Sequence, residues 1–105
     1  MNAWDGKPRY VDYQGQTIET FTRGALSIAL NRTVTTIRAM ERKGVLCHPP
    51  IKDGRGHWLY TRDQIVDLVA LATEEMVIDP RYRRPFSERF IQEAHRIISR
   101  RPQLV

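Results

Sequence analysis

Apolar side chains recur at helical spacing in four segments of the chain, and each segment follows a serine or threonine that can cap a helix. The first segment follows Thr22. Its apolar stripe consists of Leu26, Ala29 and Leu30. Asn31 then stands where the chain must turn, and asparagine tolerates the left-handed backbone better than any residue except glycine. The pattern predicts a short first helix followed by a tight turn.

A second helix is predicted to begin after Thr33 and to end at Gly44, because glycine often terminates helices. Val34, Ile37 and Met40 recur every three residues and are expected to be buried. The outward face is small and basic, which suits entry into a groove of duplex DNA. It consists of Thr35, Thr36, Arg38, Ala39, Arg42 and Lys43.

Two longer amphipathic segments are predicted to form helices in the second half of the chain. Thr61 caps the first of these helices, which forms the core of the domain and is stopped by Asp79 and Pro80. Its apolar stripe lies at positions 65, 66, 68, 69, 72 and 76. The last helix follows Ser87 and carries arginines on the remainder of its surface. Its apolar side consists of Phe86, Phe90, Ile91, Ala94, Ile97 and Ile98.

Short alternating segments predict two β-hairpins. One places Gln14 and Gly15 in the turn between residues 10–13 and 17–19. The other spans residues 45–60, with its turn at Asp53 and Gly54, and is interpreted as a wing beside the second helix. The resulting fold class is mainly α with a small β-hairpin wing.

Three regions follow from this pattern. Residues 1–20 are expected to form an N-terminal tail and the first hairpin, the tail lying in residues 1–9, where Gly, Pro and charge show no period. Residues 21–79 are expected to form a winged helix-turn-helix domain. Residues 80–105 are expected to form a basic linker and a C-terminal helix.

Charge is sorted into blocks along these elements. Residues 32–62 carry five Arg and two Lys against two acids, residues 63–79 carry five acids and no base, and residues 80–105 carry seven Arg against two Glu. The whole chain of 105 residues has a net charge of +5 and a pI near 9.9. Such a distribution favours a polyanionic partner that meets one basic face.

Composition also restricts the setting of the protein. Cys47 is the single cysteine, so no internal disulfide can form. The start, MNAWDGKPRY, lacks the pattern of a secretory signal. The longest apolar-rich stretch is interrupted by Asp67 and by the Glu74 and Glu75 pair, so no membrane span is expected. We expect a cytoplasmic, nucleoid-associated protein.

The order of the elements from helix to wing resembles the DNA-binding domain of the MerR family. That family typically shows a pattern like YTIGELAKALGVSPETLRYYERKGLL and then a wing ending in G-x-R-x-Y-T. The matching text here, between Phe21 and about Ile78, is FTRGALSIALNRTVTTIRAMERKGVL and then GHWLYT. The pattern positions are filled by Gly24, Leu26, Ala29, Leu30, Thr36, Ile37, Arg38, Glu41, Arg42, Gly44, Leu46, Tyr60 and Thr61. The segment is also similar to the winged helices of phage excisionases and of small terminase subunits.

The chain departs from the family pattern at positions to which phosphate contacts are usually assigned. Ala39 and Met40 replace two aromatic residues, and Trp58 replaces the wing arginine. Arg55 is expected to supply the missing charge at the wing tip. The long dimerising helix and the cysteine-bearing effector region have no counterpart, because Pro80 and Pro85 interrupt the chain where that helix would run.

The resemblance and the charge pattern together predict contact with double-stranded DNA. Arg38 can bind guanine in a bidentate manner while threonine methyl groups meet thymine. The wing can approach the backbone or the minor groove, because its glycines permit close contact. The predicted DNA-binding residues are Arg32, Thr33, Thr35, Thr36, Arg38, Arg42, Lys43, Lys52, Arg55 and His57.

Catalytic and metal sites are not predicted. Cys47, His48 and His57 are too few for structural zinc, which usually has four ligands. The sequence has no carboxylate pair, metal cluster or phosphate loop at a suitable spacing. We therefore expect a protein that is not an enzyme and has no cofactor.

The C-terminal helix has two alternative uses. Its apolar side is expected either to pair two copies in a homodimer or to fold back onto the third helix. The predicted function is a sequence-specific DNA-binding protein, either a small transcriptional regulator or an excisionase-like architectural factor. The alternative is an assembly adaptor, similar to a small terminase subunit, that contacts a protein partner through this helix.

Overall fold

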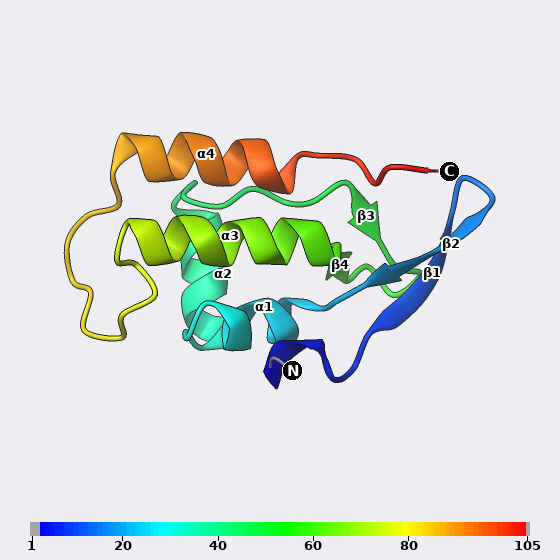
Figure 1. The fold of residues 1–105 in the computed structure, drawn as a ribbon, viewed down its shortest axis with the longest axis horizontal. Coiled ribbons are helices and arrows are strands. Elements are labelled where there is room, and N and C mark those ends of the chain that lie inside the picture. Colours follow the sequence, from blue (N-terminus) through cyan, green and yellow to red (C-terminus); the bar gives the residue numbers. More distant parts are fainter. Residues whose placement is uncertain (1–2, 105) are drawn as a thin grey trace.

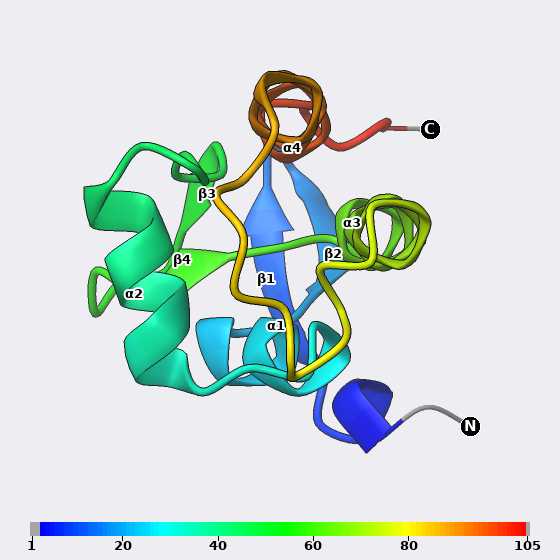
Figure 2. The same ribbon diagram turned by 90° about the vertical axis from the view of Figure 1, so that its left-hand side faces the viewer.

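The computed structural model describes residues 3–104 and shows a mainly helical fold with two small antiparallel hairpins (Figure 1). The helices α3 and α4 lie side by side along the long axis, whereas α2 runs crosswise to that axis and lies on the opposite side of the molecule from α3 (Figures 1 and 2). The elements are η1 (Ala3–Asp5), β1 (Arg9–Tyr13), β2 (Gln16–Thr20), α1 (Arg23–Ala29), α2 (Val34–Arg42), β3 (Ile51–Lys52), β4 (Trp58–Leu59), α3 (Arg62–Glu74) and α4 (Glu88–Ile98). This architecture confirms the predicted fold class.

All four predicted helix caps are present. The side-chain oxygens of Thr22, Thr33, Thr61 and Ser87 each accept a hydrogen bond from the backbone amide three residues later. Such bonds satisfy amides that have no partner inside the helix. The helix that follows each cap therefore begins where the sequence predicts.

The α3 helix ends earlier than predicted. Its last residue is Glu74, and Met76 adopts a left-handed conformation with φ of 63°. The prediction that Asp79 and Pro80 stop the helix is therefore wrong. The turn at Met76 reverses the chain so that Val77, which is 2% exposed, packs into the core.

The predicted apolar stripe of α3 is only partly correct. Ile65, Leu68 and Ala72 are buried, but Val66 is 47% exposed and Met76 is 58% exposed. Val69 is half-buried, and Leu71, which is absent from the predicted stripe, is buried at 6% exposure. The buried face is narrower than predicted because Val66 lies on the side of α3 that faces solvent, and because Met76 follows the end of the helix.

The N-terminal segment is not a loose tail over the described residues. Ala3–Asp5 forms a short 3-10 helix, and the Trp4 ring packs edge-on against Phe21 with ring centroids 5.0 Å apart. Trp4 is 7% exposed and joins the core. The prediction failed because a single buried tryptophan has no periodicity, although an aromatic ring of this size contributes strongly to a core.

The first hairpin has the predicted turn. Gln14 and Gly15 both have positive φ, 51° and 84°, which is the backbone geometry of a tight two-residue hairpin turn. The strands pair from Arg9 with Thr20 to Tyr13 with Gln16. An isolated bridge between Phe21 and Tyr60 then joins this hairpin to the wing.

The wing also forms as predicted, with short strands. Ile51 pairs with Leu59, and Lys52 pairs with Trp58. The backbone amide of Asp53 donates to the carbonyl of His57, which closes the turn.

The α4 helix folds back onto α3, and its apolar side enters the common core. Phe90, Ala94, Ile97 and Ile98 are at most 4% exposed, whereas Phe86 and Ile91 are half-buried at the edge. This packing places most of the apolar side of α4 in the core of the same chain, as the fold-back alternative predicts.

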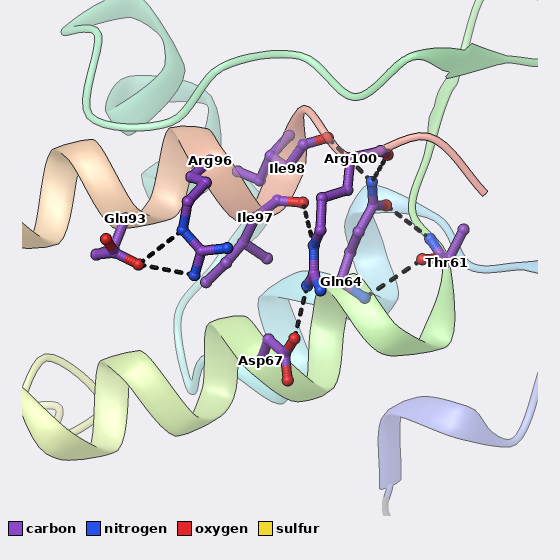
Figure 3. A network of polar contacts seen from close by, with 8 residues as sticks. All are labelled: Thr61, Gln64, Asp67, Glu93, Arg96, Ile97, Ile98 and Arg100. Carbon is purple, nitrogen blue, oxygen red and sulfur yellow. Dashed lines mark hydrogen bonds and ion pairs between the residues drawn. The ribbon is translucent and has the colours of Figure 1, made fainter. Parts of the chain in front are cut away.

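A buried glutamine connects these two helices (Figure 3). The Gln64 side chain accepts from the Thr61 amide at 2.8 Å, completing a capping box at the start of α3. Its amide nitrogen donates to the carbonyls of Ile98 and Arg100, each at 2.9 Å. One side chain therefore satisfies groups at the beginning of α3 and at the end of α4.

Candidate nucleic-acid interface

The outward face of α2 consists of exposed side chains without acidic partners. Arg38, Arg42 and Lys43 are exposed, and none of them forms an ion pair with a described residue. Thr35 is also exposed, and Thr36 is half-buried. Within the buried face, Ile37 and Met40 have the predicted burial, but Val34 remains half-buried beside the wing.

Two threonines form the beginning of this helix. Thr33 accepts from the Thr36 amide at 3.1 Å, and the two hydroxyls lie 2.9 Å apart. These bonds fix the first turn of α2. Thr33 therefore acts first as a cap, while Thr35 faces outward.

The turn before α2 contains Asn31 and the predicted DNA-binding residue Arg32. Asn31 has a φ of 58°, as predicted. The Arg32 guanidinium, however, donates to the carbonyls of Val77 and Asp79, in the segment that follows α3. Backbone carbonyls outside helices and strands need such donors, and Arg32 supplies two of them here. Arg32 therefore joins the turn before α2 to the segment that follows α3, and its predicted contact with a phosphate stays a prediction.

Asp53 organises the tip of the wing. Its Oδ1 accepts from the backbone amides of Arg55 and His57, each at 2.9 Å, and its Oδ2 lies 3.1 Å from Nη2 of Arg9 and 3.3 Å from Nδ1 of His57. The hydrogen bond from the His57 amide is the main reason that the pKa of Asp53 is lowered. Gly56 has a φ of 85°, a conformation that favours glycine. The tip is therefore fixed, and it leaves the Arg55 side chain exposed without an acidic partner among the described residues.

Trp58, which stands where the family pattern has arginine, pairs with Lys52 directly next to the turn of the wing. Its ring stacks on His48, with centroids 4.5 Å apart and planes 9° apart, and the Lys52 ammonium lies 4.6 Å from its centroid. Cation–π contact of this kind orients a lysine without neutralising it. The Lys52 side chain is exposed, and its ammonium group is held over the ring of Trp58 on the neighbouring strand of the wing.

An ion pair between α1 and α2 was not predicted. Arg23 Nη2 lies 2.9 Å from Glu41 Oε1, and His48 Nε2 lies 3.8 Å from Glu41 Oε2. Burial raises the pKa of the nearby Tyr60 phenol, and the Glu41 charge adds to the rise. Local pattern gives no signal for a pair of residues this far apart in the chain. The pair occupies Glu41, the single acid of α2, which forms no ion pair with Arg38 or Arg42.

The α4 helix supports the end of α2. His95 Nε2 forms a hydrogen bond of 2.8 Å with the carbonyl of Gly44, where α2 ends, and Cys47 Sγ lies 3.6 Å from Ser99 Oγ. Cys47 therefore belongs to packing between the wing loop and α4. Within residues 3–104, no group of three or more His, Cys, Asp or Glu side chains is placed to hold a metal ion.

Four arginines on or next to α3 and α4 form ion pairs with acids of the same chain. Arg62 pairs with Glu19 at 2.8 Å and with Asp5 at 3.2 Å. Arg89, Arg96 and Arg100 pair with acids on α3 or α4. On α2 and the wing the cations Arg38, Arg42, Lys43, Lys52 and Arg55 have no ion pair with a described acid, and we call this set the basic face.

Comparison with known proteins agrees with this arrangement. Residues 21–73 match the model of the MerR HTH family regulatory protein, which covers α1, α2, the wing and most of α3. Searches of curated proteins and of solved structures gave no match. None of the helices in the described part of the chain has the length and apolar character needed to cross a membrane.

Proposed function

The chain belongs to the MerR HTH regulatory family of non-enzymatic, DNA-binding transcriptional regulators, and we propose that it recognises specific duplex sites by placing α2 in the major groove. The major groove admits an α-helix and displays a distinct pattern of donors and acceptors for each base pair. In this proposal Arg38 binds guanine, and Thr35 and Thr36 contact neighbouring bases. A bidentate arginine–guanine contact contributes about 1–3 kcal/mol of discrimination between bases.

The other cations of the basic face are proposed to bind phosphates. Arg42 and Lys43 follow Arg38 at the end of α2, and Lys52 and Arg55 extend the charge along the wing. His57 lies beside Asp53 and adds positive charge to the tip when it is protonated. Each neutralised phosphate is expected to add about 0.9 to the salt slope of binding.

One observation supports this proposal. The cations of the basic face form no ion pairs with described acids, whereas the arginines of α3 and α4 form ion pairs with acids of the same chain. A protein that used its net charge only for solubility would not need this separation. Arg38 lies within this face, and the one acid on its helix, Glu41, is occupied by Arg23. The same binding mode serves a repressor, an activator or an excisionase-like architectural factor.

The position of α4 speaks against the assembly-adaptor alternative. That alternative places a protein partner on α4, and an apolar contact with this partner would use the apolar side of the helix. Phe90 and Ile98, at the centre of that side, are 2% and 0% exposed. Unfolding this contact to bind a partner would expose a large part of the core.

Selection of bound duplexes from a random pool, at stated salt concentration, tests the proposal. We expect a defined motif containing a guanine that depends on Arg38. A palindromic motif would indicate a homodimer on DNA, and a direct repeat would indicate head-to-tail binding. Recovery of duplexes without any shared motif would contradict specific recognition.

A further inference from the structure

A second surface, distinct from the basic face, lies between the helix-turn-helix and the loop that connects α3 to α4. It is a groove of about 810 Å³. One wall comes from the end of α1 and the first turn of α2, and the other comes from residues 80–86. We call this feature the loop groove.

The loop groove combines apolar surface with unpaired positive charge. Ile28, on its α1 wall, is 56% exposed, although a side chain of this kind is normally buried. Tyr82 and Phe86 line the opposite side, with their rings stacked 5.7 Å apart. Phe86 in turn stacks on the buried ring of Phe90 at 5.5 Å, so the apolar floor is anchored to the core.

Three arginines line the groove: Arg32, whose guanidinium is bound by backbone carbonyls, and Arg83 and Arg84 on the opposite wall. Arg83 donates to the carbonyls of Pro80 and Tyr82, and the Arg84 guanidinium lies 5.2 Å from the centroid of the Tyr82 ring. Neither arginine forms an ion pair with a carboxylate within residues 3–104, and none of the described residues that line the groove is acidic. The nearby Glu75 is already bound by Ser87 and Arg89.

We propose that the loop groove binds an acidic peptide segment of a partner protein, with carboxylates on Arg83 and Arg84 and an apolar side chain against Ile28 and Phe86. The combination of features selects this occupant. A nucleic-acid backbone would use the two arginines but has no use for the exposed apolar wall. A peptide that carries Asp or Glu beside Leu or Phe uses both, and aromatic and arginine side chains are typical of protein interfaces.

This proposal does not depend on DNA binding, because no residue of the basic face enters it. Thr33 and Thr36 nevertheless line the same groove from the first turn of α2. A peptide bound there would therefore lie directly beside the helix proposed to read DNA.

Peptide selection with the full chain as bait tests the proposal. Short random peptides are displayed and selected on the wild-type chain in the absence of DNA, with an Arg83→Ala/Arg84→Ala variant used to remove peptides that bind elsewhere. We expect enrichment of sequences with Asp or Glu next to Leu or Phe. Failure to enrich any sequence, or enrichment of peptides without acidic residues, would overturn the proposal.

The recovered peptide, labelled with a fluorophore, is then titrated with matched variants. Arg83→Ala/Arg84→Ala and Ile28→Asn are each expected to weaken binding by at least about tenfold. Arg101→Ala serves as the control, since Arg101 is exposed and lies outside the groove. Equal binding by all variants would place the peptide elsewhere and overturn the proposal. The proposal would also be overturned if Arg83→Ala/Arg84→Ala leaves the affinity for the peptide unchanged but lowers the affinity for duplex DNA. That outcome would show that the groove contacts DNA.

Discussion

Arg23 of α1 and Glu41 of α2 are joined by an ion pair of 2.9 Å, Nη2 to Oε1, which fixes the two helices of the helix-turn-helix against each other. The Glu41 side chain is 7% exposed, and the Arg23 side chain is 22% exposed. Removal of one partner would leave the other charge partly buried and unpaired, which costs more than the pair contributes.

Substitution of Arg23 by Ala is expected to lower the free energy of unfolding by about 1.5–3 kcal/mol, because hydrogen bonds to charged groups have this magnitude. Urea unfolding measures the change. The double variant Arg23→Ala/Glu41→Ala is expected to lose less than the sum of the two single variants. Strictly additive losses would show that the two side chains are not coupled.

A second prediction concerns Gln64, whose side-chain oxygen and nitrogen have different partners. Gln64→Glu can still accept from the Thr61 amide but cannot donate to the carbonyls of Ile98 and Arg100. We expect this variant to destabilise the protein by about 1–3 kcal/mol, the cost of unsatisfied buried polar groups. Chemical denaturation measures the loss, and hydrogen exchange is expected to show the largest change at the end of α4. Stability equal to that of the wild type would mean that water replaces the glutamine without cost.

A third prediction is that Arg32→Ala changes the stability of the protein but not the number of phosphates that it contacts on DNA. Arg32→Ala removes the donors to the carbonyls of Val77 and Asp79, and we expect a loss of about 1 kcal/mol or more in unfolding free energy. The salt slope of DNA binding by the folded variant is expected to stay unchanged. A slope reduced by about one unit would instead assign Arg32 to a phosphate.

Acid is expected to loosen the wing through Asp53. The pKa of this carboxyl is lowered from its ordinary value of 3.8, mainly by the hydrogen bond from the His57 amide. A depressed folded-state pKa means that the ionised carboxylate favours folding above the ordinary pKa, and this contribution is lost as the pH falls through the folded-state pKa. Asp53→Asn should therefore weaken the fall in stability between about pH 5 and pH 2. The free energy of unfolding is measured for the wild type and for Asp53→Asn across this pH range. The same dependence on pH in both proteins would contradict this role of Asp53.

Local features of the structure could be predicted from the sequence because their causes are local. Thr33 caps α2 because its hydroxyl reaches an amide three residues away, and Gly15 permits a turn that needs positive φ at that residue. The outward position of Arg38 follows from helical periodicity in the same way. These features require no knowledge of what packs against them.

The missed features depend on residues that are far apart in the chain. Trp4 packs on Phe21, Arg32 reaches Val77, and Gln64 caps α4, and none of these contacts has a signature in local spacing. The end of α3 was misplaced for a related reason. Proline marks where a helix must stop, whereas the reversal at Met76 is set by burial of Val77.

The most direct test measures the affinity for the selected duplex and for a random duplex at one salt concentration. The ratio of these two affinities is then compared between the wild type and Arg38→Ala. If Arg38 reads a base, Arg38→Ala is expected to lower the ratio of specific to random affinity by about 5- to 150-fold, which corresponds to the loss of about 1–3 kcal/mol of discrimination. Lys43→Ala, the matched control from the same helix, is expected to weaken both affinities equally. An equal loss on both duplexes for Arg38→Ala would contradict the central claim that α2 reads sequence through this residue.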